Sequence, residues 1–305
     1  MVKKLTYYKN FNIKKNHQKS IILIGNFDGV HLGHQKLFDS AKNYKKKENL
    51  KIGVVTFDPI PKMFFNKKLK NYRISNLNQK LNIFKKFKVD FVINKKFSKI
   101  KYNKFISEII YKKLNPKIIF VSNNFRFGNK REGDVKLLKL LEKKYNYKII
   151  NPPTLKKKNK TISSTLIRKL LTDGKLNLAN NYLNRNWSIE GVVKKGRNMG
   201  KKIGFPTCNI DIENYVIARP GVYAVKVNIL NSNKILKGIA NLGYRPTFNQ
   251  KKILLEVNIF NFSRNLYNKK LTVEFIKFIR GEKKFKGMDQ LKKQIKLDIK
   301  SAKRT

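Results

Sequence analysis

Between residues 21 and 150, short apolar runs alternate with longer stretches in which apolar and polar residues are mixed. The apolar runs predict buried strands at 21–25, 51–58, 89–94 and 116–122. The mixed stretches predict helices over 34–47, 76–87, 103–114 and 134–145. This alternation indicates a parallel α/β sheet, which binds ligands beyond the carboxyl ends of its strands.

After about residue 186 the pattern changes to strands with few helices between them. Strands are predicted at 187–193, 221–229, 234–243, 252–262 and 271–279. They indicate a mostly antiparallel barrel or sandwich. A last helix over 288–302 places Met288, Leu291, Ile295 and Ile299 on one face, which we expect to pack on the strands. We therefore predict two domains, 1–185 and 186–305.

The composition narrows the classes of function. The formal net charge is +53, but the lysines are spread along the chain, which favours solvated faces over a nucleic-acid interface, and no nucleic-acid partner is expected. The single Cys208 excludes an intramolecular disulfide and a multi-cysteine metal site, and favours a reducing compartment. No apolar stretch approaches the length of a membrane span, and the N-terminal segment lacks the apolar core of a signal peptide. We expect a cytoplasmic protein with no membrane partner.

The stretch GNFDGVHLGH (25–34) follows the first predicted strand and carries His31 and His34. A helix that begins near Gly33 places both rings at its first turn, beside exposed backbone N–H groups that attract phosphate. Histidines there can donate hydrogen bonds to a polyphosphate as charge moves onto the leaving group. A metal site formed by the two histidines would need further His or Cys ligands, which this stretch lacks. A capping or packing role for both histidines stays open at this point.

A second stretch, TISSTLIRKLL, supplies hydroxyl groups at a predicted helix start, with Arg168 one turn further on. The ordered pair of H-x-G-H and S-S-T-x-x-R resembles the nucleotidylyltransferase superfamily. With VVTFDPIP and VSNNFRFGNKREGD between them, the chain resembles the bacterial bifunctional riboflavin kinase/FMN adenylyltransferase family. The resemblance implies a Rossmann-like first domain that transfers AMP from ATP to FMN. By position it implies an ATP loop formed by Gly25, Phe27, Asp28, His31, Gly33 and His34. It implies that the flavin side is lined by Asn124 and Arg126. It also implies that the phosphates are clasped by Ser164, Thr165 and Arg168.

The stretch GVVKKGRNMGKKIGFPTCNID (191–211) is neither a P-loop nor a dinucleotide fingerprint. If 207–209 is extended, Thr207 and Asn209 project to one face and offer two neutral oxygens to a hydrated Mg²⁺ that carries nucleotide phosphates. A capped turn before a strand is the alternative.

The same stretch, followed by GVYAV, NLGYRPTF, LEVNIF and FIRGEKKF, resembles the riboflavin kinase module, which is a β-barrel with a terminal helix. Glu256 occupies the position of that family's catalytic base; on its own, a strand glutamate paired with a lysine is the simpler reading. The resemblance also implies that the nucleotide is bound by Gly191, Gly196, Gly200, Lys201, Gly204 and Pro206. It implies that the flavin is bound by Arg245.

The function that the resemblance implies is flavin cofactor biosynthesis with Mg²⁺, ATP being the co-substrate of both steps. Riboflavin is phosphorylated to FMN in the second domain, and FMN is adenylylated to FAD with release of pyrophosphate in the first. The alternatives are a relative with one inactive domain or another acceptor, and a basic RNA-binding protein. The sequence indicates no oligomeric state.

Overall fold

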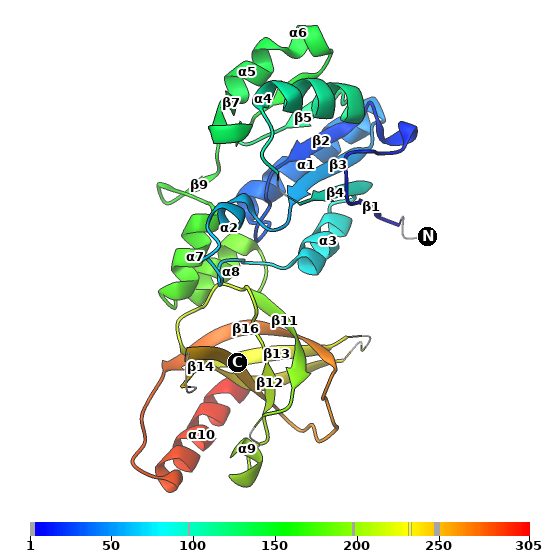
Figure 1. Ribbon diagram of the computed structural model, residues 1–305. Helices are drawn as coiled ribbons and strands as arrows, with labels where there is room; N and C mark the ends of the chain where they lie inside the picture. The colour runs from blue at the N-terminus through cyan, green and yellow to red at the C-terminus, as the bar shows by residue number, and fades with distance from the viewer. Residues whose placement is uncertain (1–3, 97, 197–198, 231, 233, 247–250) are drawn as a thin grey trace. The chain divides into compact units, whose positions relative to one another are not determined.

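The structure is a computed structural model that describes residues 4–96, 98–196, 199–230, 232, 234–246 and 251–305 (Figure 1). The chain divides into two compact units. The first unit combines Met1–Leu69 with Leu77–Ser163, and the second combines Lys70–Asn76 with Ser164–Thr305.

The core of the first unit is a parallel sheet of six strands, which confirms the predicted fold class. The order is β1-β4-β3-β2-β5-β8, with bounds Thr6–Tyr8, Phe91–Lys95, Ile52–Phe57, Ile21–Ile24, Ile118–Phe120 and Lys148–Ile150. The four predicted strands correspond to β2, β3, β4 and β5. The sequence pattern did not indicate β1 and β8, because these three-residue strands do not lie in a longer apolar run, whereas β5 of the same length does.

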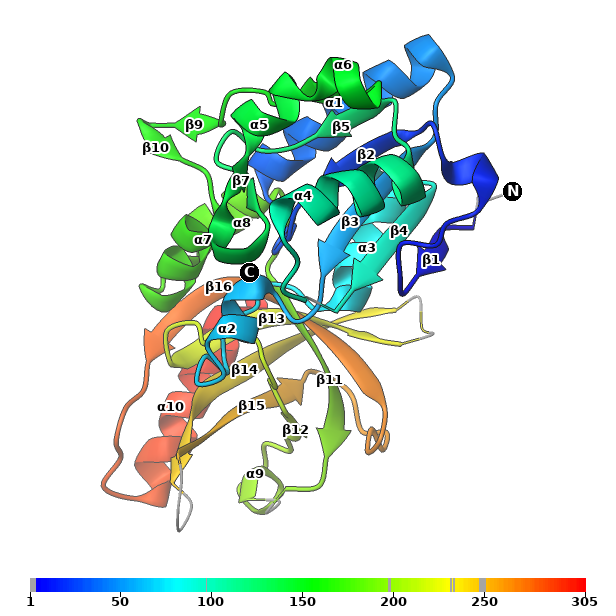
Figure 2. The same ribbon diagram turned by 45° about the horizontal axis from the view of Figure 1, so that its top comes forward.

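Helices cover both faces of this sheet (Figure 2). Successive residues of β2 point to opposite faces: Ile21 and Leu23 pack with α1 (Leu32–Glu48) and α3 (Leu77–Lys86). Ile22 and Ile24 instead pack with the π-helix Phe105–Leu114 and with α5 (Val135–Leu140). Because every residue of β2 is buried, the strand reads as a continuous apolar run.

The prediction of one helix over 134–145 is wrong in one detail, because the helix is interrupted at Leu141. The backbone of Leu141 leaves the helical region, with φ −95° and ψ 5°, and α6 begins at Glu142 (Glu142–Tyr145). The hydroxyl of Tyr147 donates to the carbonyl oxygen of Leu138 at 3.0 Å. A side chain that takes a helix carbonyl in this way interrupts the helical ladder.

The remaining elements of the first unit are short. They are η1 (Lys15–His17), α2 (Pro61–Phe65), α4 (Tyr102–Lys104), β6 (Arg126–Phe127), η3 (Asn129–Arg131), β7 (Gly133–Asp134), β9 (Lys156–Lys157) and β10 (Lys160–Thr161). Of the helices within the described ranges, none combines the length and the apolar composition that a bilayer crossing needs.

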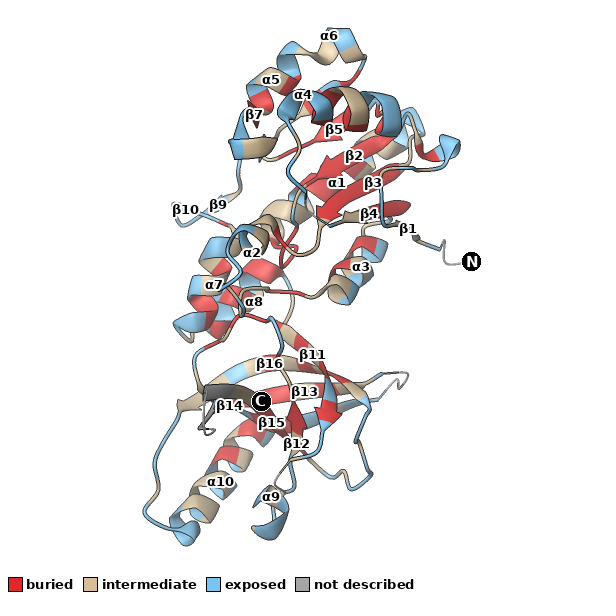
Figure 3. Cartoon of the chain, in the orientation of Figure 1, coloured by how far each residue is buried: buried red, intermediate tan, exposed pale blue. Residues whose placement is uncertain are grey.

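The second unit contains a closed antiparallel barrel, so the barrel of the two predicted alternatives is confirmed. Its strand order is β11-β12-β15-β14-β13-β16, with bounds Ser188–Lys194, Cys208–Ile210, Lys251–Ile259, Ile235–Pro246, Gly221–Ile229 and Lys270–Gly281. Buried and partly exposed residues alternate over the first half of β16, up to Phe275. Figure 3 shows buried residues of the barrel in red, for example along β11 and β13. Phe275 is packed against Trp187 and Tyr223, with ring centroids 4.7 and 5.0 Å away.

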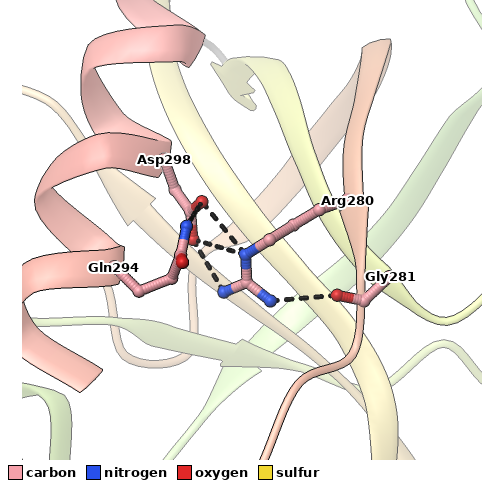
Figure 4. A network of polar contacts seen from close by, with 4 residues as sticks. All are labelled: Arg280, Gly281, Gln294 and Asp298. Carbon is pink, nitrogen blue, oxygen red and sulfur yellow. Dashed lines mark hydrogen bonds and ion pairs between the residues drawn. The ribbon is translucent and has the colours of Figure 1, made fainter. Parts of the chain in front are cut away.

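The predicted terminal helix is α10 (Met288–Lys303), and an ion pair joins it to the barrel (Figure 4). Arg280 of β16 donates from Nε and Nη2 to the carboxylate of Asp298, at 3.0 and 2.7 Å. Gln294 donates to the same carboxylate at 2.9 Å. Because Asp298 is only 4% exposed, this pair fixes the helix on the sheet.

The second unit also includes α7 (Ser164–Thr172), α8 (Leu176–Leu183) and α9 (Met199–Lys202). Asn180 of α8 donates to the carbonyl oxygen of Phe275 at 3.0 Å and accepts from the N–H of Trp187 at 2.8 Å. The indole N–H of Trp187 donates to the carbonyl oxygen of Ile74 at 3.0 Å. These bonds tie α8 and the segment 70–76 to the barrel. The boundary near residue 185 between the two predicted domains, 1–185 and 186–305, stays a prediction.

Candidate active sites

The loop from Gly25 to His31 leaves β2 at the point where the order of the sheet reverses. The chain moves from β2 to β3 and β4 on one side and later returns to β5 on the other side. Such a switch point leaves a crevice at the carboxyl ends of the strands. The N–H of Gly25 donates to the carbonyl oxygen of Val55 at 3.1 Å, which fixes the start of the loop. Phe27 has φ +48° and is 2% exposed, so its ring anchors the loop in the core.

The two histidines lie together, as the sequence predicts. His31 is the N-cap residue of α1, and its ring stacks on that of His34 with centroids 3.7 Å apart. Gly33 lies between them, and a Cβ atom there would come within 3.2 Å of Nδ1 of His31. Both rings therefore lie at the first turn of a 17-residue helix, where backbone N–H groups are unpaired within the helix.

His34 is set up to stay neutral. Its Nδ1 atom is buried and has no hydrogen-bond partner among the described residues. Burial, His31 and Lys80 together lower the pKa of His34 well below its usual 6.5, burial being the largest cause. A neutral imidazole carries one N–H donor and one acceptor nitrogen, so this ring can donate to a phosphate oxygen without itself being charged.

Lys80 is a functional candidate that the sequence interpretation missed. It lies on α3, is 7% exposed, and its ammonium donates to the carbonyl oxygen of Asn26 at 3.3 Å. A signal was present in the sequence, because Leu77, Lys80, Leu81 and Phe84 have the i, i+3, i+4, i+7 spacing of a buried helix face. A lysine in that stripe indicates a buried charge.

The predicted flavin-side residues follow β5, the strand beside β2. Asn124 is exposed, and its Oδ1 accepts from the hydroxyl of Ser122 at 2.9 Å. Arg126 is half-exposed and donates to the carboxylate of Asp134 at 3.0 Å. Asp134 also caps α5 by accepting from the N–H of Leu137. The ion pair gives the guanidinium a fixed place at the carboxyl end of the sheet.

Ser164, Thr165 and Arg168 belong to the second unit, where α7 begins at Ser164 as predicted. The guanidinium of Arg168 lies 3.6 Å above the ring of Tyr72, and its Nε donates to the carbonyl oxygen of Tyr72 at 2.8 Å. The stack and the hydrogen bond together fix the plane of the guanidinium. In the first unit, a Cβ atom at Gly33 would lie 3.4 Å from the carbonyl oxygen of Ile162, two residues before α7.

The second candidate site is built on β12 and β15. Asn209 is 8% exposed, and its Oδ1 is buried without a hydrogen-bond partner among the described residues. A Cβ atom at Gly196 would fall 1.5 Å from Nδ2 of Asn209, and one at Gly200 would fall 3.1 Å from Oγ1 of Thr207. Glycine is therefore required at Gly196 beside Asn209, whereas at Gly200 the closest clash, at 2.4 Å, is with the carbonyl oxygen of Phe205.

The strand register places Glu256 directly opposite Asn209 on one side and Asn241 on the other. Side chains of directly opposed residues share a face, with Cβ atoms about 4.5–5.5 Å apart. The neighbours of Glu256 along the strand, Leu255 and Val257, are buried on the opposite face. Asn241 was missed in the sequence, because its place follows only from the register of three strands.

The other predicted residues of this site differ in their surroundings. Gly191 lies within β11, where a Cβ atom would come 2.4 Å from Ile210, so close packing already requires glycine there. Gly204 has φ +89°, which favours glycine. Lys201 is exposed on α9, and Asn258 donates to the carbonyl oxygen of Pro206 at 2.7 Å.

Arg245 lies in β14, but its side chain is outside the described part.

The donor set of the second site suits a hard cation. The oxygens of Thr207 and Asn209 are neutral, and Mg²⁺ in nucleotide sites takes few protein ligands besides phosphate and water. The unpartnered Oδ1 of Asn209 fits such a role. Within the described ranges, no three His, Cys, Asp or Glu side chains are grouped closely enough to hold a metal ion by themselves.

Comparisons with known proteins match both halves of the chain. The family model described as FAD synthetase matches residues 13–166, and the one described as riboflavin kinase matches residues 183–305. The bifunctional riboflavin kinase/FMN adenylyltransferase of Buchnera aphidicola subsp. Schizaphis graminum is 41% identical, with 96% of each chain covered. That of Escherichia coli K12 is 36% identical, with 94% of this chain and 93% of the relative covered.

A similar solved structure covers the same span. The crystal structure described as a macrolide-efflux protein from Streptococcus pneumoniae has a TM-score of 0.85 and 28% identity, with 99% of each chain covered. The likeness therefore extends over both units and includes the barrel as well as the parallel sheet.

Proposed function

The chain belongs to the bifunctional riboflavin kinase/FMN adenylyltransferase family, and from this premise we propose how its two candidate sites divide the two reactions. Riboflavin and ATP give FMN and ADP in one step, and FMN and a second ATP give FAD and pyrophosphate in the other. The domain of residues 1–185 carries the adenylyl transfer, and the domain of residues 186–305 carries the phosphorylation.

In the adenylyl transfer, a phosphate oxygen of FMN attacks the α-phosphorus of ATP, and the bond to the β-phosphate oxygen breaks. The attacking oxygen is already anionic, so no proton has to be removed. The stacked rings of His31 and His34 donate hydrogen bonds to the phosphates as charge moves onto pyrophosphate. Arg168, with Ser164 and Thr165, clasps phosphates in this reaction, and the stack on Tyr72 supports its role by fixing its plane.

Gly25, Phe27, Asp28 and Gly33 shape the loop that receives ATP. Their surroundings support this role: Phe27 and Asp28 are buried, and a Cβ atom at Gly33 would lie in tight contact with the ring of His31, 3.2 Å from Nδ1. Asn124 and Arg126 receive the flavin nucleotide, since they follow β5 at the carboxyl edge of the same sheet.

In the phosphorylation, the 5′-hydroxyl of riboflavin attacks the γ-phosphorus of ATP, and ADP leaves. Glu256 accepts the hydroxyl proton, because an alcohol becomes a competent nucleophile only as that proton departs. Asn209 and Asn241, which flank Glu256 across the strands, fix the surroundings of the carboxylate. Arg245 holds the flavin, and the nucleotide lies along the turn from Gly191 and Gly196 through Gly200, Lys201 and Gly204 to Pro206.

Mg²⁺ is the metal that the donor set fits. Thr207 and Asn209 would hold it through their oxygens, and when bound it neutralises charge on the transferring phosphates. Neighbouring residues shape this site. Gly196 and Gly200 let the turn approach the Asn209 and Thr207 side chains, and Asn258 holds the backbone at Pro206.

The observation that carries the proposal is the cross-strand row of Asn209, Glu256 and Asn241, beside a buried amide oxygen without a partner. The test supplies the purified full chain with riboflavin, ATP and Mg²⁺ and separates the flavins by chromatography. FMN should appear first and FAD later. FMN that accumulates without FAD would mean an inactive or redirected first domain, and RNA binding that falls steeply with salt, with no flavin turnover, would favour the RNA-binding alternative.

A further inference from the structure

Lys80 is a buried cation at the carboxyl edge of the parallel sheet. It lies on the face of α3 that also carries Phe84, which is completely buried. Its side chain reaches past the apolar core to the ends of two strands. A lysine is rarely buried to this extent unless its ammonium group is paired with other polar groups.

The contacts of Lys80 define a small network. The ammonium donates to the carbonyl oxygen of Asn26 at 3.3 Å and to Oγ1 of Thr56 at 3.2 Å. Thr56, which is completely buried at the end of β3, donates in turn to the same carbonyl oxygen at 3.1 Å. Asn26 belongs to the loop that carries His31. The network therefore ties the backbone of this loop to the neighbouring strand.

A lysine at this position carries a cost in free energy that its contacts must offset. Removing an ammonium group from water is costly, and an apolar side chain of similar length on the same stripe would avoid that cost. Lys85 and Lys86, on the same helix, are exposed and carry no such cost. One group that Lys80 holds is the backbone at the start of the candidate ATP loop.

We propose that Lys80 is a positioning residue of the adenylyl-transfer site, whose buried ammonium fixes the histidine loop at Asn26 and brings a positive charge to the backbone of this loop. The proposal rests on the adenylyl transfer proposed above. A phosphate-binding loop gains from such a charge, because an anion bound in front of the loop is attracted without a covalent or proton-transfer step. After burial and His31, Lys80 is the third cause that lowers the pKa of His34.

The test compares three variants of the full chain with the wild type. Lys80→Met keeps the length and removes the charge, Lys80→Arg keeps the charge in a bulkier group, and Lys85→Met is a matched control at an exposed position of the same helix. FAD formation from FMN is measured at varied ATP, FMN formation from riboflavin is measured as an internal control, and stability is measured by urea denaturation.

We expect Lys80→Met to lower kcat/KM for ATP in FAD formation by about 10- to 100-fold, the scale of a small misplacement of reacting groups. FMN formation and the unfolding midpoint should stay at the wild-type values. Lys80→Arg should retain more FAD formation than Lys80→Met, whereas a residue that only fills space would give the reverse order, because arginine fits the site less well.

Three outcomes would overturn the proposal. In the first, Lys80→Met forms FAD at a rate within twofold of the wild type. In the second, Lys80→Arg retains less FAD formation than Lys80→Met. The third is a parallel fall of FAD formation, FMN formation and unfolding midpoint in Lys80→Met, which would assign Lys80 to folding. A wild-type chain that makes no FAD from FMN would instead refute the proposed function, whatever the variants do.

Discussion

The two candidate sites meet phosphate groups with different kinds of side chain. In the first unit, the loop after β2 presents the His31–His34 pair, and the buried ammonium of Lys80 holds the backbone of this loop. In the second unit, β12 and β15 present oxygens, from Thr207 and Asn209 and the carboxylate of Glu256. The nucleophile explains the difference. A phosphate oxygen of FMN attacks as an anion and needs no base, whereas a ribityl hydroxyl must lose a proton.

The two sites also differ in how they are held in place. The first is set by burial, since Phe27 and Val30 anchor the loop in a core that α1 and α3 complete. The second is set by strand register, which aligns three polar residues on the face opposite Leu255 and Val257. A change in one site should therefore leave the other intact, and this independence is what the following experiments challenge.

The largest effect is expected for Glu256→Gln. The amide keeps the shape but cannot accept the proton, so FMN formation should fall by about 10²- to 10⁴-fold, the usual contribution of a general base. FAD formation from supplied FMN should be unchanged. Initial rates with riboflavin or with FMN as the substrate measure the two activities separately. Equal losses in both, with intact folding, would contradict one site per unit.

The reciprocal experiment is the double substitution His31→Ala and His34→Ala. Loss of the phosphate donors should lower FAD formation by about 10²- to 10³-fold, as for the removal of a preorganised donor to a developing charge. FMN formation should persist at the wild-type rate. The matched control is His17→Ala, since His17 is buried in the same unit against Tyr8 and Phe91, away from the loop. A double variant that still makes FAD as fast as the wild type would remove the histidines from the site.

A smaller effect is expected for Asn209→Ala, which removes a proposed Mg²⁺ ligand. The Mg²⁺ concentration at half-maximal FMN formation should rise by about 10- to 100-fold, the range known even for outer partners of metal sites. The Mg²⁺ concentration at half-maximal FAD formation should stay unchanged. Asn258→Ala is a useful contrast, because the side-chain amide of Asn258 donates to the backbone carbonyl oxygen of Pro206 and is not a proposed Mg²⁺ ligand. An unchanged Mg²⁺ requirement in Asn209→Ala would leave the buried amide oxygen without the proposed role.

Much of the first site was predictable from the sequence, and the reason is local. His31 and His34 are three residues apart at the start of a helix, so their proximity follows from helical geometry. Lys80 was predictable in principle, because it interrupts the apolar stripe of α3. Tyr72 was not, since its contact with Arg168 joins residues 96 positions apart and depends on how the segment 70–76 folds back.

The second site shows the same limit more clearly. The family resemblance identified Glu256, but its alignment with Asn209 and Asn241 depends on the pairing of three strands that a period of two cannot specify. The interruption at Leu141 depends on the hydroxyl of Tyr147, which no propensity of residues 134–145 encodes. Elements follow from local pattern, whereas contacts between distant elements require the fold.

The smallest effect concerns the pH dependence of stability, and it distinguishes the units because all three histidines of the chain lie in the first. Burial, His31 and Lys80 lower the pKa of His34 in the folded chain, so below pH 6.5 the unfolded chain takes up a proton that the folded chain does not. Stability is thus unaffected above this pH and is lost as the pH falls below it.

Between pH 7.5 and 5.5 the wild type should lose at most about 1.4 kcal/mol more unfolding free energy than His34→Gln. Urea denaturation of both proteins at the two pH values, followed by circular dichroism, measures this difference. A wild type that is no more sensitive to acid than the variant would mean that His34 accepts a proton in the folded loop, and the first site would then bind phosphate with a charged imidazole rather than a neutral one.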